Sequence, residues 1–179
     1  SLAAVLVIDI LQDLLAARTL IGLGMSEPDA GSAVTQLATT ARPDGADYVI
    51  DGTKVFSTHS ADATVFLIYV RYGPGTDGIG SVIVERGTPG FSQGPPSEFM
   101  SGEHWCQLYF DNCRIPAGNV VLGPGGFRKQ MSGFNVERIG NAARSLALGR
   151  LAFETAKVHA TEREQFGRAL CDFQGTQWK

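Results

Sequence analysis

Three patterns of apolar residues follow one another along the chain. Near the start, apolar residues recur at spacings of three and four, which predicts an amphipathic helix over residues 2–18. Residues 20–122 consist instead of short runs rich in Val, Ile, Tyr and Phe, separated by turn-forming clusters, and these runs predict strands. After the glycine-rich stretch 123–126 the spacing returns to three and four. This last pattern predicts a long helix that continues past residue 160.

The predicted strands follow one another without a helix between them, which is typical of an antiparallel sandwich or barrel. Pro43, Asp44 and Gly45 between two of them mark a hairpin, because proline presets one turn residue and glycine accepts a positive φ. We therefore expect a mainly β fold with flanking α-helices. The predicted strands are Leu20–Met25, Ala38–Ala41, Tyr48–Ile50, Thr64–Tyr72, Gly80–Glu85 and Cys106–Phe110.

Charge and hydropathy exclude several classes of protein. The 179 residues carry 15 Lys and Arg against 18 Asp and Glu, a net charge of −3, so we expect no nucleic-acid partner. The apolar run near the start ends at Asp9, far short of the ~20 residues that cross a bilayer, so no membrane span is expected. The three histidines are scattered along the chain and have no ligand-like spacing to the cysteines, so no metal site is expected.

The cysteines and the chain ends bear on location and completeness. Cys106, Cys113 and Cys171 form no CxxC pair, and their odd number argues against a disulfide framework, so we expect a reducing, cytoplasmic location. The chain begins on Ser1 rather than Met and shows no helix-ending signal before Lys179. We expect it to be a piece of a longer protein.

A sandwich or barrel does not by itself require three polar motifs found here. Residues 25–32 follow a predicted strand and gather hydroxyls and acids in a short loop, which can turn N–H groups toward an anionic or heteroaromatic ligand. Residues 54–62 place a Phe two positions before a Thr, and residues 162–168 place Arg, Phe and Gly at a predicted helix end. Taken singly, each motif has a simpler structural explanation: the first is more often just a turn, the second fits an edge strand with outward polar residues, and the third is a charged helix terminus.

Together, and in this order, the motifs resemble those of the acyl-CoA dehydrogenases, flavoproteins that oxidise acyl-CoA thioesters to enoyl-CoA. Ser26–Ser32 resembles the family's T-E-P-x-A-G-S loop, and Gly52–Thr58 resembles its G-x-K-x-W-I-T strand. Leu108–Pro116 is similar to L-x-F-x-x-V-x-V-P, and Glu162–Gly167 is similar to E-R-x-x-F-G. The resemblance implies the tail of an N-terminal helical domain in residues 1–19, a middle antiparallel β-barrel in 20–122 and the start of a C-terminal helical domain in 123–179.

The resemblance also implies FAD as the cofactor. Phe56 would stack on the isoalloxazine, and Thr58 would hydrogen-bond near the flavin nitrogen that receives hydride. Arg163 would reach the pyrophosphate of a neighbouring subunit's FAD, where its fork of donors suits two phosphates, which implies a homo-oligomer, dimer or tetramer. The residues implied to bind FAD are Leu23, Met25, Ser26, Ser32, Phe56, Ser57, Thr58, Arg163, Gln165, Phe166 and Gln174, and those implied to bind acyl-CoA are Ser32, Asn135 and Arg138.

The reaction needs a carboxylate that removes the α-proton of the thioester. In the family this glutamate comes either from a late loop, which would lie beyond Lys179, or from the long helix. Phe134–Arg138 is similar to the L-x-x-E-R motif of isovaleryl-CoA and long-chain acyl-CoA dehydrogenases and supplies Glu137. No Lys or Arg stands three or four residues from Glu137 to form a simple surface ion pair with it. Both sources of the base stay open.

Departures from the family pattern bear on the acyl-chain specificity more than on flavin binding. Phe56 replaces the usual Trp, Ala33 stands where an Asp usually follows, and residues 99–105 lack the common G-x-R-x-S pattern. We expect FAD-dependent dehydrogenation of an acyl-CoA, with an electron-transferring flavoprotein or similar acceptor. The rivals are an acyl-CoA oxidase or flavin monooxygenase of the same superfamily, and a non-catalytic structural subunit.

Overall fold

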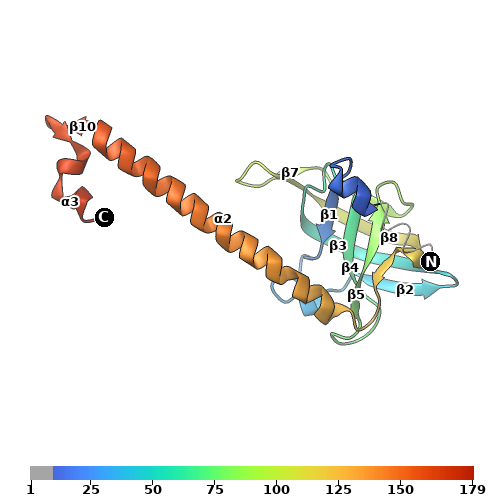
Figure 1. Cartoon of the computed structure of the whole chain (residues 1–179). Coiled ribbons are helices and arrows are strands. Elements are labelled where there is room, and N and C mark those ends of the chain that lie inside the picture. The colour runs from blue at the N-terminus through green and yellow to red at the C-terminus, as the bar shows by residue number, and fades with distance from the viewer. Residues whose placement is uncertain (1–9) are drawn as a thin grey trace. The chain divides into compact units, whose positions relative to one another are not determined.

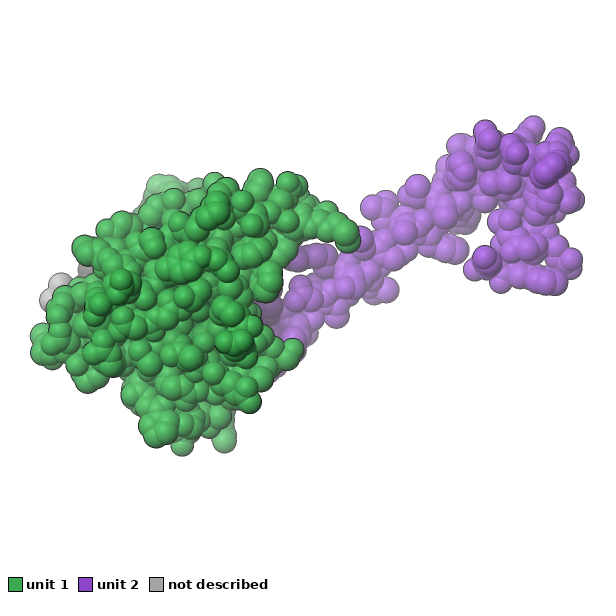
Figure 2. All heavy atoms as spheres, turned by 180° about the vertical axis from the view of Figure 1, so that it is seen from behind, with its two compact units in different colours: residues 1–130 green, residues 131–179 purple. Residues whose placement is uncertain are grey.

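The computed structural model describes residues 10–179 (Figure 1). The chain separates into two compact units, the first ending at Gln130 and the second covering Met131–Lys179 (Figure 2). Of the helix predicted over residues 2–18, residues 10–15 are helical, and residues 2–9 lie outside the described part. The predicted division into three segments stays a prediction.

The described part of the first unit contains nine strands. The predicted hairpin is confirmed, since β2 and β3 pair antiparallel and are joined at Asp44 and Asp47. All six predicted strands are present, although two of them are much longer than predicted, and three short ones were not foreseen. The strands are β1 (Ile21–Gly24), β2 (Thr40–Asp44), β3 (Asp47–Thr58), β4 (Val65–Arg71), β5 (Ile79–Glu85), β6 (Phe91–Gln93), β7 (Ser97–Glu98), β8 (His104–Pro116) and β9 (Val120–Leu122), with short 3₁₀ turns at Val34–Gln36 and Ala117–Asn119.

These strands form one mixed sheet in the order β6-β8-β3-β2-β4-β5-β9, to which β1 and β7 add on β4 and β8. Most neighbouring strands are antiparallel, but β1 pairs with β4 in parallel. The first residue of β2, Thr40, also pairs in parallel with Arg71 of β4. The expectation of a wholly antiparallel sheet was therefore wrong, because a long connection that includes the β2–β3 hairpin separates β1 from β4 and permits parallel pairing. The pairings of the described strands do not close into a barrel, so the closed barrel stays a prediction.

The core of the first unit is built from inward-facing residues of five strands. Strand β8 alternates between buried and exposed residues over most of its length, whereas β4 and β5 are buried almost throughout and therefore appear in the sequence as short runs rich in Val, Ile and Phe. The cluster comprises Ala41, Ile50, Ala63, Phe66, Ile68, Val70, Val82, Val84, Leu108, Phe110, Cys113 and Ile115.

The two cysteines of β8 both face this interior. Cys106 and Cys113 are buried free thiols, and burial, together with the charge of Asp51, raises the pKa of Cys113 to about 11. Cys171, in the second unit, is also free but only half-buried. All three cysteines are free thiols, so no disulfide bond stabilises this fold.

The long helix α2 spans Phe127–Glu162, as its apolar spacing predicted, and forms the main element of the second unit. It ends where the E-R-x-x-F-G motif begins. A tight two-stranded turn follows, made by β10 (Glu164–Gln165) and β11 (Arg168–Ala169), and then a 3₁₀ turn (Leu170–Asp172) and the short helix α3 (Gln174–Gln177).

Strand β3 is interrupted twice by a register shift against β8, first between Ile50 and Gly52. Gly52 has a φ of +148°, and a Cβ there would lie 2.5 Å from Oγ1 of Thr39 and 2.7 Å from its Cα. Only glycine fits this position, because both the backbone conformation and the close approach of Thr39 exclude a side chain.

We predict that Gly52→Ala lowers the free energy of unfolding by about 2–4 kcal/mol, because strain and overlap act together. The matched control is Gly45→Ala in the β2–β3 turn, where φ is +65° but a Cβ would meet no atom within 4 Å. That control should cost about 1 kcal/mol. Equal losses in urea denaturation of the two variants would contradict the role assigned to Thr39.

Candidate flavin site

The second register shift in β3 arranges the predicted flavin strand. Lys54 pairs with Leu108 and Ser57 with Cys106, so three steps along β3 match two steps along β8, and one residue is extra. Such a bulge reverses which face the following side chains occupy. As a result Lys54 is buried, while Phe56 and Thr58 are exposed on the outer face of the sheet.

Phe56 occupies this bulge in an uncommon backbone conformation. Its φ is +55°, which is costly for a bulky side chain, and its ring is 60% exposed. The ring rests against Trp105, with the centroids 4.7 Å apart. Trp105 pairs directly with Thr58 and stacks in turn on Phe99, with those two centroids 5.9 Å apart. The three rings together offer an exposed aromatic surface on which a planar ligand can stack.

The loop that follows β1 lies against this same part of β3. The backbone N–H of Val55 donates to the carbonyl of Ser26 at 2.9 Å, and Nζ of Lys54 approaches the carbonyl of Met25 at 3.3 Å. The 25–32 loop is thus hydrogen-bonded to the 54–62 segment, and these are two of the segments that the resemblance implies to bind FAD. Leu23, at the end of β1, faces outward, and Ser32 is exposed farther along the loop.

A buried ion pair lies beneath this loop, and the sequence reasoning missed it. Nζ of Lys54 lies 2.7 Å from Oε1 of Glu27, and the Lys54 side chain is completely buried. Burial lowers the pKa of Lys54 to about 8, although the charge of Glu27 acts in the opposite direction. Burial alone would raise the pKa of Glu27, but the Lys54 charge and several hydrogen bonds outweigh it and lower that pKa. The available signal was a lysine within a segment that otherwise reads as a strand.

Ser57 and Thr58 differ in what their hydroxyls can reach. Thr58 is exposed beside Phe56, which fits the predicted contact with a flavin. Ser57 is 1% exposed, and its Oγ has no hydrogen-bond partner among the described residues. Its side chain therefore belongs to the interior of the sheet, and only its backbone is available to a ligand on the Phe56 face.

The other predicted residues belong to the second unit. Glu137 is exposed on α2 and makes no ion pair within the part of the chain that the structure describes, and Nη1 of Arg138 donates to Oδ1 of Asn135 at 3.0 Å. Phe166 has a φ of +54° and is 94% exposed at the β10–β11 turn, which also carries Gln165. Arg163 immediately precedes β10, and Gln174 begins α3.

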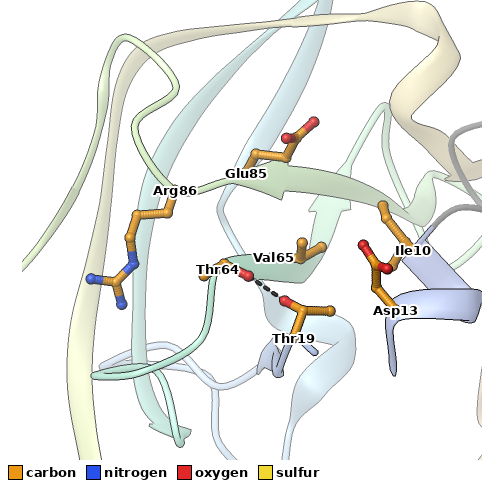
Figure 3. A pocket seen from close by; sticks show the side chains of 7 residues that line it. All are labelled: Ile10, Asp13, Thr19, Thr64, Val65, Glu85 and Arg86. Atoms are coloured by element: carbon orange, nitrogen blue, oxygen red, sulfur yellow. Dashed lines mark hydrogen bonds between the residues drawn. The ribbon is translucent and has the colours of Figure 1, made fainter. Parts of the chain in front are cut away.

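A separate surface pocket of about 480 Å³ lies on the first unit (Figure 3). The Thr19 and Thr64 hydroxyls are hydrogen-bonded there, and Arg86 donates to backbone carbonyls of the 60–63 segment. None of the predicted FAD or acyl-CoA residues lines it, so it contributes nothing to the candidate site. The lining residues are Ile10, Asp13, Thr19, Thr64, Val65, Glu85 and Arg86.

Two further observations concern residues 10–179 alone. No group of three or more His, Cys, Asp or Glu side chains is arranged to hold a metal ion. No helix there is long and apolar enough to cross a membrane.

Comparison with known proteins identifies the family. Residues 22–113 match the acyl-CoA dehydrogenase middle domain, and residues 124–179 match the acyl-CoA dehydrogenase C-terminal domain. The chain belongs to the acyl-CoA dehydrogenase family. Its two matched regions contain the outer face of β3 and the long helix α2, the two parts on which the predicted site depends.

The relatives span a range of acyl-CoA dehydrogenases. An acyl-CoA dehydrogenase of Bacillus subtilis is 36% identical over 160 residues, which is 87% of this chain and 42% of the relative. Isovaleryl-CoA dehydrogenase of Oryza sativa subsp. japonica is 36% identical over 162 residues, covering 88% of this chain and 40% of the relative. The chain thus spans about two fifths of the length of these curated relatives.

Solved structures agree with this assignment. A probable acyl-CoA dehydrogenase of Mycobacterium abscessus has a TM-score of 0.93 and 33% identity, covering 97% of this chain and 47% of that one. A glutaryl-CoA dehydrogenase of Mycobacterium smegmatis in complex with FADH2 has a TM-score of 0.86 and 30% identity, covering 93% and 43%. FAD is the cofactor of this acyl-CoA dehydrogenase family.

The residues of the first unit fit such a cofactor. The exposed ring of Phe56 and the exposed hydroxyl of Thr58 share one face, and the N–H of Ser26 donates to no described residue. A planar, hydrogen-bonding ring system matches an aromatic surface bordered by a hydroxyl and a free amide.

We predict that Ser57→Ala leaves the free energy of unfolding unchanged or raises it, because the Ser57 Oγ is buried without a partner. The matched control is Ser60→Ala, since Oγ of Ser60 is also buried but accepts from the N–H of Cys106 at 2.6 Å. That variant should lose about 1–3 kcal/mol, measured by urea denaturation. A comparable loss in Ser57→Ala would mean that the Ser57 hydroxyl has a partner.

Proposed function

We propose that the protein containing this chain is an FAD-dependent acyl-CoA dehydrogenase that introduces an α,β double bond into an acyl-CoA thioester. The observation that carries the proposal is the outer face of β3, where a bulge turns Phe56 and Thr58 outward beside the Met25–Ser26 loop. Family membership supports the same reading. The substrate and the activity of the whole protein are proposals, because the chain covers less than half of its relatives.

In this proposal two groups of residues bind FAD. The first unit supplies Leu23, Met25, Ser26, Ser32, Phe56, Ser57 and Thr58, with Ser57 acting through its backbone because its side chain is buried. The second unit supplies Arg163, Gln165, Phe166 and Gln174 toward the FAD of a neighbouring subunit, which makes the protein a homo-oligomer. Ser32, Asn135 and Arg138 bind the acyl-CoA.

Glu137 is the proposed base. It removes the α-proton of the thioester as the β-hydrogen departs as hydride, so the substrate loses one proton and one hydride and gains a C=C bond. Bound FAD supplies the acceptor for that hydride. Support comes from the position of Glu137 on α2 next to Arg138, whose guanidinium is already oriented by Asn135, and from its lack of a described ion-pair partner.

Further parts of the proposal concern the setting of the enzyme. An electron-transferring flavoprotein or a similar acceptor reoxidises the cofactor, and the enzyme acts in the cytoplasm. We also propose that the sheet closes into a β-barrel in the intact protein.

The experiment is to purify the intact protein and record its visible spectrum before and after anaerobic addition of acyl-CoA thioesters. We expect a flavin spectrum that bleaches with acyl-CoA and not with free fatty acid. Absence of flavin would point to a structural subunit. Rapid recolouring in air with peroxide release would identify an oxidase.

We predict that Glu137→Gln slows bleaching of the flavin by about 10²–10⁴-fold, because general base catalysis contributes about that factor. FAD content should be unchanged, since only the proton acceptor is lost. The control is Glu154→Gln, an exposed residue of the same helix that pairs with Lys157 at 2.9 Å. If stopped-flow bleaching of the two variants proceeds at the same rate, the base is another residue.

A further inference from the structure

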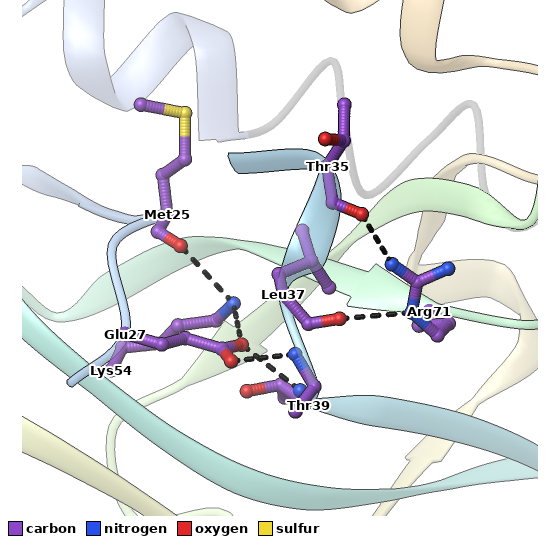
Figure 4. Close-up of polar contacts among 8 residues, drawn as sticks. Met25, Glu27, Thr35, Leu37, Thr39, Lys54 and Arg71 are labelled. Atoms are coloured by element: carbon purple, nitrogen blue, oxygen red, sulfur yellow. Dashed lines mark hydrogen bonds and ion pairs between the residues drawn. The ribbon is translucent and has the colours of Figure 1, made fainter. Parts of the chain in front are cut away.

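In the peptide between Met25 and Ser26, the carbonyl is hydrogen-bonded and the N–H has no described acceptor. Its carbonyl, from Met25, accepts from Nζ of Lys54 at 3.3 Å, on the buried side of the loop (Figure 4). The chain contains no cis peptide among the described residues, and in a trans peptide the C=O and N–H point in opposite directions. The Ser26 N–H therefore points away from Lys54, and it donates to no described residue.

The next carbonyl is held in the same way. The N–H of Val55 donates to the carbonyl of Ser26 at 2.9 Å, so β3 binds two consecutive carbonyls of the loop. Val55 immediately precedes Phe56. The anchors on the loop and the exposed aromatic ring thus come from consecutive residues of one strand.

Glu27 fixes Lys54 in this position. Besides Lys54, its carboxylate accepts from the backbone N–H of Ala38 at 2.6 Å and of Thr39 at 2.9 Å (Figure 4). Charged acceptors on backbone N–H groups make strong hydrogen bonds, and in a buried site they hold one geometry.

Arg71 holds the same 35–39 segment from its other side. Its guanidinium donates to the carbonyls of Thr35 and Leu37 at 2.7 and 2.8 Å (Figure 4). The segment therefore gives its N–H groups to Glu27 and receives hydrogen bonds from Arg71. Neither the segment nor the Glu27 carboxylate can shift without breaking several of these contacts.

We propose that Lys54 and Glu27 are positioning residues for the cofactor: the ion pair draws the Met25 carbonyl inward and so aims the Ser26 N–H at the flavin. This inference rests on the proposed function, because the ligand of the free amide is taken to be FAD. An amide aimed at the flavin stabilises its electron-rich reduced form more than its oxidised form. Lys54 thereby acts on the cofactor through the peptide it holds, without touching it.

The test compares Lys54→Met and Glu27→Gln in the intact protein. Lys54→Met keeps an apolar stem but loses the donor to Met25, and Glu27→Gln removes the charge that holds Lys54. In both, FAD should bind about tenfold more weakly, the scale of one lost charge-assisted hydrogen bond. The ratio of affinities for reduced and oxidised FAD should fall about fivefold, seen as a more negative flavin potential.

The matched control removes an ion pair that does not touch the loop. Arg42 on β2 pairs with Asp51 at 2.7 Å and is exposed, so Arg42→Met should leave both FAD affinity and potential unchanged. If Lys54→Met does not fold, the Glu27→Gln variant and the pH measurement below still test the proposal.

The wild-type protein offers a second measurement. The pKa of Lys54 is about 8, Glu27 is the charged group that faces it, and its cross-strand partner on β8 is the apolar Leu108. Between pH 7 and 9.5 Lys54 loses its proton and holds the Met25 carbonyl less firmly. FAD affinity of the wild type should therefore fall over this range more steeply than that of Glu27→Gln.

The outcomes separate this inference from the proposed function. A wild-type protein without FAD would overturn both. A wild type that binds FAD, with variants equal to it in affinity, potential and pH profile, would overturn only the positioning role. Weaker binding with an unchanged potential and pH profile would also overturn it, because the pair would then merely stabilise the loop.

Discussion

One extra residue in β3 determines the organisation of the first unit. If β3 paired with β8 without the bulge between Lys54 and Ser57, strict alternation would put Lys54, Phe56 and Thr58 on the same face. Either the lysine would lose its buried partner or the aromatic would enter the core. The bulge allows one strand to supply a buried anchor for the loop and, two residues later, an exposed surface for a ligand.

The bulge has a cost, and the surrounding structure offsets it. A phenylalanine at a φ of +55° persists only where neighbours fix the chain, and Trp105 does this from β8 while the Met25–Ser26 loop does it from the other side. The buried pair is likewise supported by further hydrogen bonds: Lys54 also donates to the Met25 carbonyl, and Glu27 also accepts from the backbone N–H groups of Ala38 and Thr39. Such a pair contributes more to a single loop geometry than to overall stability.

The elements that could be predicted from the sequence are those with a distinct pattern of apolar residues. Apolar residues recur every three or four positions in the long helix α2, and β4 and β5 are almost continuous apolar runs, so the positions of these elements were predicted within a few residues. From the apolar pattern alone β3 was predicted over only three residues, because Gly52 and Lys54 interrupt its apolar run, and the rest of the strand was implied only by the resemblance. The parallel pairing of β1 with β4 depends on contacts distant in sequence, which no local pattern records.

The candidate site divides in the same way. Its members were predicted through resemblance; in the fold, Phe56 and Thr58 are both exposed on β3, and the Met25–Ser26 loop is hydrogen-bonded to the preceding residues of that strand. Ser57 was assigned to the cofactor with its neighbours, but one position along a strand is enough to turn its hydroxyl inward. Trp105 could not be inferred, because its contact with Phe56 depends on the pairing of β8 with β3.

The distribution of the thiols has a practical consequence. Cys106 and Cys113 are buried in β8, and the raised pKa of Cys113 leaves it almost entirely protonated at neutral pH, whereas Cys171 is partly accessible in the second unit. Maleimide reagents react with accessible thiolate, so among the three thiols of this chain Cys171 is the preferred point of attachment. A spin label or fluorophore placed there would report on the turn that carries Gln165 and Phe166 while the sheet stays unmodified.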